Sequence, residues 1–169
     1  VPFGEFLPFD NLLKRLGFKK ITEGHDSFLK GKDDNNLIVG VLNILPLICY
    51  EVIFTDLIQK SDSNTNLIVN ISEDAWFGKS IGPDQHFAKS IFRAIESNTF
   101  FLRSTNKGVS AIIDNKGNII KQLNRNEAVN IDFEVPLIKS NKIKNDLIFF
   151  VLLITYLLIF LIYKNRNAK

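Results

Sequence analysis

The sequence predicts an α/β domain followed by one C-terminal transmembrane helix. Between residues 37 and 134, short apolar runs rich in β-branched residues alternate with stretches whose apolar positions recur at helical spacing. From 147 to 163 the chain runs seventeen residues without a charge. The only cysteine, Cys49, ends one of the apolar runs. These three features predict a sheet that presents a thiol at a strand end and is tethered to a membrane.

Each apolar run is short enough to be one strand, and turn residues separate most of them. We expect strands at 37–42, 45–48, 66–71, 100–105, 109–113, 118–121 and 128–134. Apolar spacing predicts a helix over 51–60 and a second one that begins near Pro83. The polar segment 72–78 follows a buried strand, so we expect it to line a cleft. Residues 114–117 predict a hairpin turn.

Charge and composition exclude several classes of protein. The net charge is +3, and Lys164, Arg166 and Lys169 supply all of that surplus, so the body before them is electrically balanced. A balanced body argues against a nucleic-acid partner, because binding the phosphate backbone requires clustered cations. A single cysteine excludes an internal disulfide and a multi-cysteine zinc site. Because the chain begins on Val1 and contains no methionine, we expect it to be the C-terminal piece of a longer protein.

The uncharged run 147–163 has the composition of a membrane-spanning helix. As a helix it would be about 26 Å long, slightly less than a hydrocarbon core, and the flanking Lys144 and Lys164 could extend its reach. A helix buried on all sides inside a soluble protein is the alternative. Three cations flank the run on each side, so local charge does not set its orientation.

Cys49 lies in Leu47-Ile48-Cys49-Tyr50-Glu51, where an apolar run ends abruptly at a thiol, a phenol and a carboxylate. A strand that stops at a sharp turn presents its last side chain to a cleft, which suits a nucleophile. The alternative is a small buried apolar residue, the common fate of a lone cysteine.

Five motifs, in unbroken order over about residues 1 to 135, resemble the carbon-nitrogen hydrolase (nitrilase) superfamily. More narrowly, they resemble its membrane-bound branch, the apolipoprotein N-acyltransferases. The motifs are Val1-Pro2-Phe3-Gly4-Glu5-Phe6, Ile48-Cys49-Tyr50-Glu51, Asn70-Ile71-Ser72 with Asp74-Ala75-Trp76-Phe77-Gly78, Gly82-Pro83 with Gln85-His86, and Arg103-Ser104-Thr105-Asn106 with Gly108. Together they are far more specific than any one of them.

The resemblance implies part of an αββα nitrilase-like sandwich at the outer face of the bacterial inner membrane. The soluble domain would face the periplasm, and the full protein would cross the membrane several times. The implied chemistry uses a Glu-Lys-Cys triad with no metal and no cofactor. The cysteine takes an acyl chain from a phospholipid as a thioester and passes it to the N-terminal amine of diacylglyceryl-cysteine in an apolipoprotein. Phospholipid donor, apolipoprotein acceptor and lipid bilayer are therefore the expected partners.

The resemblance assigns the nucleophile to Cys49 and acidic positions near the acyl site to Glu5 and Glu51. The family's triad lysine and glutamate lie upstream of the motif that contains Glu5, so neither has a counterpart here. Lys14 and Lys19 lie downstream of that motif and do not replace the lysine. We therefore expect little turnover from these 169 residues alone.

The other candidate side chains have two interpretations each. Tyr50, Trp76 and Phe77 could form an apolar wall for the acyl chain, or belong to an ordinary core. Glu5 could instead be a solvated turn residue, and Glu51 a carboxylate in the first turn of a helix. His86, on the inward face of a helix, is expected to be a hydrogen-bonded structural residue, and His25 a solvated one.

The expected organisation is a C-terminal part of the hydrolase domain at 1–138, a polar connector at 139–146, the membrane helix at 147–163 and a basic tail at 164–169. Two other functions stay open. The chain could belong to a membrane-tethered amidase whose thioester is cleaved by water, or be a degenerate, non-catalytic remnant.

Overall fold

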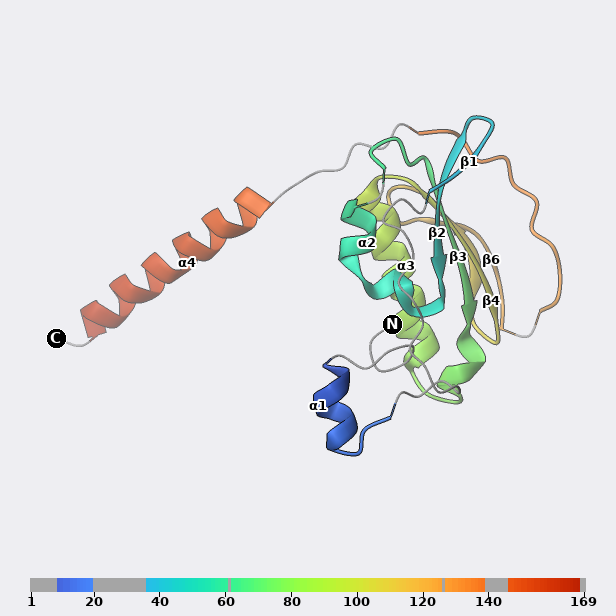
Figure 1. The fold of residues 1–169 in the computed structure, drawn as a ribbon. Coiled ribbons are helices and arrows are strands. Elements are labelled where there is room, and N and C mark those ends of the chain that lie inside the picture. Colours follow the sequence, from blue (N-terminus) through green and yellow to red (C-terminus); the bar gives the residue numbers. More distant parts are fainter. Residues whose placement is uncertain (1–8, 20–35, 61, 126, 139–145, 168–169) are drawn as a thin grey trace.

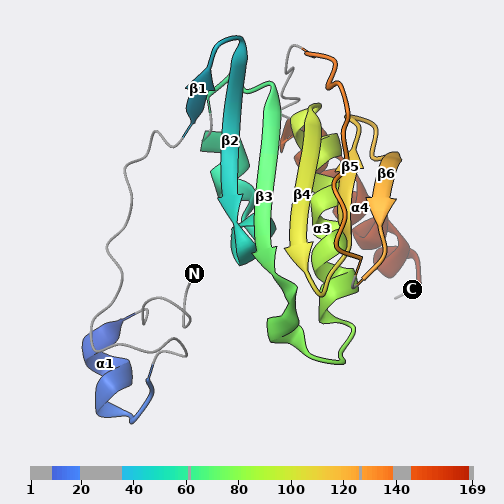
Figure 2. The same ribbon diagram turned by 90° about the vertical axis from the view of Figure 1, so that its right-hand side faces the viewer.

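A six-stranded mixed sheet forms the centre of the protein in a computed structural model, which describes residues 9–19, 36–60, 62–125, 127–138 and 146–167. The strands lie side by side in the order of the sequence (Figure 2). They are β1 Leu37–Val39, β2 Leu42–Ile48, β3 Leu67–Glu73, β4 Phe100–Asn106, β5 Ser110–Ile113 and β6 Ile119–Leu123. The predicted α/β class is confirmed.

The three central strands, β2, β3 and β4, are parallel, whereas β1, β5 and β6 run antiparallel to their neighbours. Parallel neighbours require crossover connections. The 3₁₀ helix η1 Cys49–Ile53 and helix α2 Thr55–Lys60 connect β2 to β3, and η2 Asp74–Phe77 and α3 Gly82–Ser97 connect β3 to β4. The carboxyl ends of the three strands therefore meet at one edge, where η1 and η2 begin (Figure 1).

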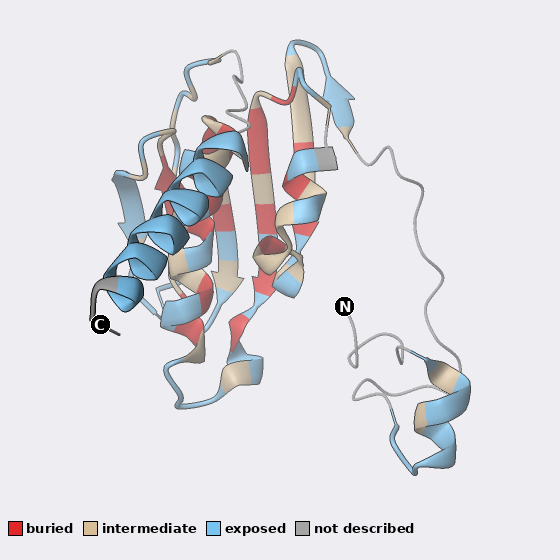
Figure 3. Cartoon of the chain, turned by 90° about the vertical axis from the view of Figure 1, so that its left-hand side faces the viewer, coloured by how far each residue is buried: buried red, intermediate tan, exposed pale blue. Residues whose placement is uncertain are grey.

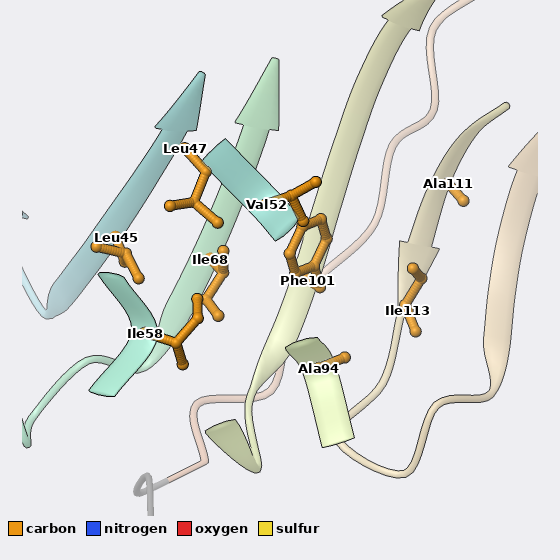
Figure 4. Close-up of a cluster of buried hydrophobic side chains, with 9 residues drawn as sticks. All are labelled: Leu45, Leu47, Val52, Ile58, Ile68, Ala94, Phe101, Ala111 and Ile113. Atoms are coloured by element: carbon orange, nitrogen blue, oxygen red, sulfur yellow. The ribbon is translucent and has the colours of Figure 1, made fainter. Parts of the chain in front are cut away.

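Helices α2 and α3 cover one face of the sheet and enclose the main core (Figures 1 and 4). Side chains on a strand alternate between the two faces, so the residues of β2 to β5 that face these helices contribute to this core. Its buried members are Leu45, Leu47, Val52, Ile58, Ile68, Ala94, Phe101, Ala111 and Ile113. This packing fixes the helices, and with them the segments that follow β2 and β3.

The opposite face carries a smaller cluster that contains Leu67, Phe100 and Ile112. Ile131 and Phe133, from the extended segment 127–138, pack against it. The strand expected at 128–134 is therefore wrong, because this segment places its alternating apolar side chains on the face of the sheet and forms no strand pairing with it.

Two other predicted elements are each split into two elements in the structure. The run 37–42 is a hairpin, because Gly40 adopts a φ of 58° and turns the chain between β1 and β2. The helix expected over 51–60 divides into η1 and α2, with Phe54 extended between them. Arg93 of α3 donates hydrogen bonds to the carbonyls of Val52 and Ile53, which a continuous helix would use internally.

Helix α4, Asp146–Asn167, is apolar on all sides over residues 147–163. Its segment Leu147–Asn165 has a mean hydropathy of 2.6, and none of it is buried against the rest of the described chain (Figure 3). By length and composition this helix could cross a membrane. The helix includes the predicted span 147–163, whereas residues 139–145 of the expected connector lie outside the described residues.

Candidate active site

The turn that carries Cys49 follows directly after β2. Cys49 has a φ of 49°, a left-handed conformation that is uncommon for a residue with a side chain. The backbone N–H of Ile48, just before Cys49, donates a 2.7 Å hydrogen bond to the carboxylate of Glu51, shortly after it, and this bond closes the turn. Cys49 is half-buried. The thiol is thus placed at the carboxyl end of a core strand without being enclosed by the core.

The carbonyl oxygen of Cys49 has two hydrogen-bond partners from other elements. Asn70 Nδ2, on β3, donates to it at 3.2 Å and also donates to the carbonyl of Leu47 at 3.0 Å. His86 Nε2, on α3, lies 3.2 Å from the same Cys49 oxygen. Because a carbonyl can only accept, this contact is a hydrogen bond in the tautomer that carries a hydrogen on Nε2. These contacts stabilise the unusual backbone conformation of Cys49.

Beneath the turn lies a buried polar network centred on Asp74, which is 1% exposed. Arg103 of β4 donates to Asp74 Oδ2 at 2.7 Å, and the hydroxyl of Ser72 donates to Asp74 Oδ1 at 2.7 Å. His86 Nδ1 lies 2.9 Å from the same Oδ1. Arg103 also donates to Asn70 and to Ser90. One buried anion and one buried cation thus compensate each other next to the thiol.

The network lowers the pKa of Asp74. Burial by itself raises this pKa, but hydrogen bonds from His86, Ser72 and Arg103, together with the charge of Arg103, outweigh burial. The pKa of the Arg103 guanidinium is also lowered, chiefly by burial, although Asp74 and the Cys49 sulfur oppose that shift. Asp74 is therefore ionised at neutral pH, and the guanidinium compensates its charge.

The structure brings some of the predicted site residues together and separates others. Tyr50 and Phe77 have ring centroids 6.3 Å apart, and both pack against the His86 ring, at 5.7 and 5.4 Å. Trp76 is instead 68% exposed. The expectation of an inward-facing, hydrogen-bonded His86 is confirmed. Glu5 and His25 lie outside the described residues.

Sequence reasoning did not identify the network itself. Asn70, Ser72 and Asp74 alternate along the chain, so they continue the core-facing side of β3 beyond Ile68. Arg103 is the register partner of Asn70 across β3 and β4. The alternation was a usable signal, but the pairing with Arg103 required the strand register. Among the described residues, no group of three or more His, Cys, Asp or Glu side chains could hold a metal ion.

Gly108 is buried against Asp74, and we expect Gly108→Ala to disturb the network. A Cβ at this position would lie 2.0 Å from Asp74 Oδ2, the atom that pairs with Arg103. We expect a loss of about 1–3 kcal/mol in the free energy of unfolding, the usual range for overpacking. Urea denaturation followed by circular dichroism measures it. An Asp74→Ala background removes the contacts with Oδ2 and Cγ and keeps only the 2.8 Å contact with Cβ, so the same substitution should cost less there. An equal loss in both backgrounds would contradict this origin.

A half-buried thiol at the carboxyl end of a parallel strand, above a charge-compensated polar network, has the arrangement of a thiol enzyme. The family comparison agrees with this class: residues 17–137 match the carbon-nitrogen hydrolase family, and the chain belongs to it.

Two relatives show where the chain lies within this family. It is 44% identical over 124 residues to the apolipoprotein N-acyltransferase of Rhodopseudomonas palustris, covering 73% of this chain and 23% of that protein. It is 44% identical over 140 residues to the apolipoprotein N-acyltransferase of Rickettsia typhi, covering 80% of this chain and 27% of that protein. The chain thus spans about a quarter of the length of the curated relatives it matches.

Proposed function

We propose that this chain carries the nucleophile of an apolipoprotein N-acyltransferase. The thiolate of Cys49 attacks an ester carbonyl of a phospholipid, forms a thioester with the acyl chain and releases a lysophospholipid. The N-terminal amine of diacylglyceryl-cysteine in an apolipoprotein then attacks the thioester, which forms an amide and regenerates the thiol. The observation that carries the proposal is the position of Cys49, at a positive-φ turn after β2, in a chain 44% identical to enzymes of that name.

The remaining site residues have proposed roles that follow from their positions. Glu51 maintains the turn through its bond to the Ile48 N–H. Tyr50 and Phe77, packed together beside Cys49, form one wall of an acyl-chain site, and exposed Trp76 contacts the lipid where it enters. Glu5 keeps the acidic role that the family resemblance implies. The triad lysine and glutamate would come from the part of the relatives that this chain does not span.

The proposed setting is the bacterial inner membrane, with the domain 1–138 on the periplasmic side. Helix α4 would provide the membrane anchor at 147–163, after the connector 139–146 and before the basic tail 164–169. An exposed, uniformly apolar helix supports this setting, because in water it would leave a large apolar surface uncovered. A multi-pass topology would require further spans beyond the one helix of this kind among the described residues.

A chimera tests the proposed reaction. The matched 124-residue segment of this chain replaces the corresponding segment of the Rhodopseudomonas palustris relative. With phospholipid and a diacylglyceryl-cysteine peptide, the chimera should add one acyl chain to the peptide amine, as measured by mass spectrometry. The 169-residue chain alone should show little turnover, because an unactivated thiol is only a few per cent ionised at neutral pH.

The products discriminate between the possible functions. Release of free fatty acid without peptide acylation would contradict acyl transfer and favour an amidase-type enzyme whose thioester is cleaved by water. A folded chimera that forms neither product would favour a degenerate remnant. Robust N-acylation by the 169-residue chain alone would contradict the dependence on residues it lacks.

A further inference from the structure

We propose that Ser72 stabilises the thiolate of Cys49 by moving its hydroxyl hydrogen bond from Asp74 to the sulfur when the thiol loses its proton. The proposal builds on the proposed function, in which Cys49 is the nucleophile, and it adds a residue that sets how readily the nucleophile forms.

Ser72 has two acceptors within reach and one hydrogen to donate. Its Oγ lies 2.7 Å from Asp74 Oδ1 and 3.5 Å from Cys49 Sγ. While the sulfur is protonated, the hydroxyl donates to Asp74, and the weak S–H donor faces the hydroxyl oxygen. When the sulfur is ionised, it becomes a charged acceptor at the same position. Asp74 is a charged acceptor in both states, so ionisation of the sulfur gives the hydroxyl two charged acceptors, and the exchange depends on the other donors that the carboxylate keeps.

Asp74 can release this hydrogen bond because it has other partners. Oδ2 keeps the 2.7 Å ion pair with Arg103, and Oδ1 keeps the contact with His86 Nδ1 at 2.9 Å. The carboxylate therefore stays compensated when the hydroxyl leaves it. Without those partners, the free-energy penalty of removing a donor from a buried carboxylate would exceed the free energy gained from the new hydrogen bond to the sulfur.

The surroundings of Ser72 make this exchange specific to one residue. Ser72 is only 6% exposed, so water competes weakly for its hydroxyl. Ser90 is another buried serine in the same network, and it accepts a hydrogen bond from Arg103 at 3.2 Å. Ser90 donates to the His86 carbonyl at 3.5 Å rather than to the sulfur. The two serines thus share an environment and differ in their contact with Cys49.

Alkylation of the single cysteine tests the proposal in the full chain. Iodoacetamide reacts with the thiolate: the sulfur forms a bond to the CH₂ carbon, iodide leaves, and the thiol proton has passed to the buffer. Because the chain has one cysteine, alkylation found on the peptide that contains Cys49 reports on this thiol alone. The rate is measured from pH 6 to 10 in detergent micelles. In Ser72→Ala, the pH at which the rate is half-maximal should rise by about one unit, the size expected for one lost charge-assisted bond.

Two further variants separate this effect from a loss of structure. Ser72→Thr keeps a hydroxyl and should keep the parent profile, and Ser90→Ala should keep it as well. An unchanged or lower midpoint in Ser72→Ala would overturn the proposal, and so would an equal rise in Ser90→Ala. The assay requires no acyl transfer, so the proposed reaction could fail while this coupling holds, or the reverse.

Discussion

Arg103→Ala should lower the free energy of unfolding by about 3–5 kcal/mol, the range observed when one partner of a buried ion pair is removed. The guanidinium of Arg103 is the cation paired with Asp74, at 2.7 Å, and both residues are almost completely buried. Alanine would leave the carboxylate without its charge partner and remove a donor from Asn70. Because Asn70 also binds the carbonyl of Cys49, the turn at the nucleophile should loosen too.

Urea denaturation of the 169-residue chain in detergent, followed by circular dichroism, measures this loss. The matched control is Arg125→Ala, which removes an arginine paired with Asp84 on the surface. Both partners of that pair are well exposed, so its contribution should be at most about 1 kcal/mol. Equal losses in the two variants would contradict the role assigned to the buried pair.

Cys49→Ala in the chimera should reduce N-acylation by more than about 10⁴-fold, as expected when a covalent enzyme loses its nucleophile. The structural change is small, because the side chain loses one half-buried sulfur. Stability should therefore change little while transfer disappears. Initial rates of peptide acylation measure the effect, and thermal unfolding verifies that both proteins are folded. A Cys49→Ala chimera that retains transfer within tenfold of its parent would exclude a thioester at this position.

The sequence predicted the sheet well wherever a strand is a buried apolar run, as in β3, β4 and β5. The prediction failed where contacts between residues far apart in the sequence determine the local secondary structure. Arg93 competes for the carbonyls of Val52 and Ile53 and so divides the expected helix over 51–60, and no local pattern signals that contact. Segment 128–134 has strand-like alternation, but its side chains pack on the face of the sheet instead.

The candidate site was predictable to a similar extent. The position of Cys49 followed from an apolar run that ends at polar residues, which is a local signal. The network below it was not predictable in the same way, because Asp74 and Arg103 are separated along the chain and meet only through the pairing of β3 with β4. Glu51 shows the limit of local reasoning, because a carboxylate at this position is equally typical of a helix first turn and of an active site. In the structure it accepts a hydrogen bond from the Ile48 N–H and so closes the turn at Cys49.

Trapping the acyl-enzyme tests the central claim most directly. The chimera is incubated with phospholipid in the absence of an amine acceptor, denatured in acid and digested for mass spectrometry. We predict one acyl chain on the peptide that contains Cys49, removable by neutral hydroxylamine as a thioester is, and absent from Cys49→Ala. An acyl group found on another residue, or transfer that proceeds with Cys49 unmodified throughout, would contradict the account.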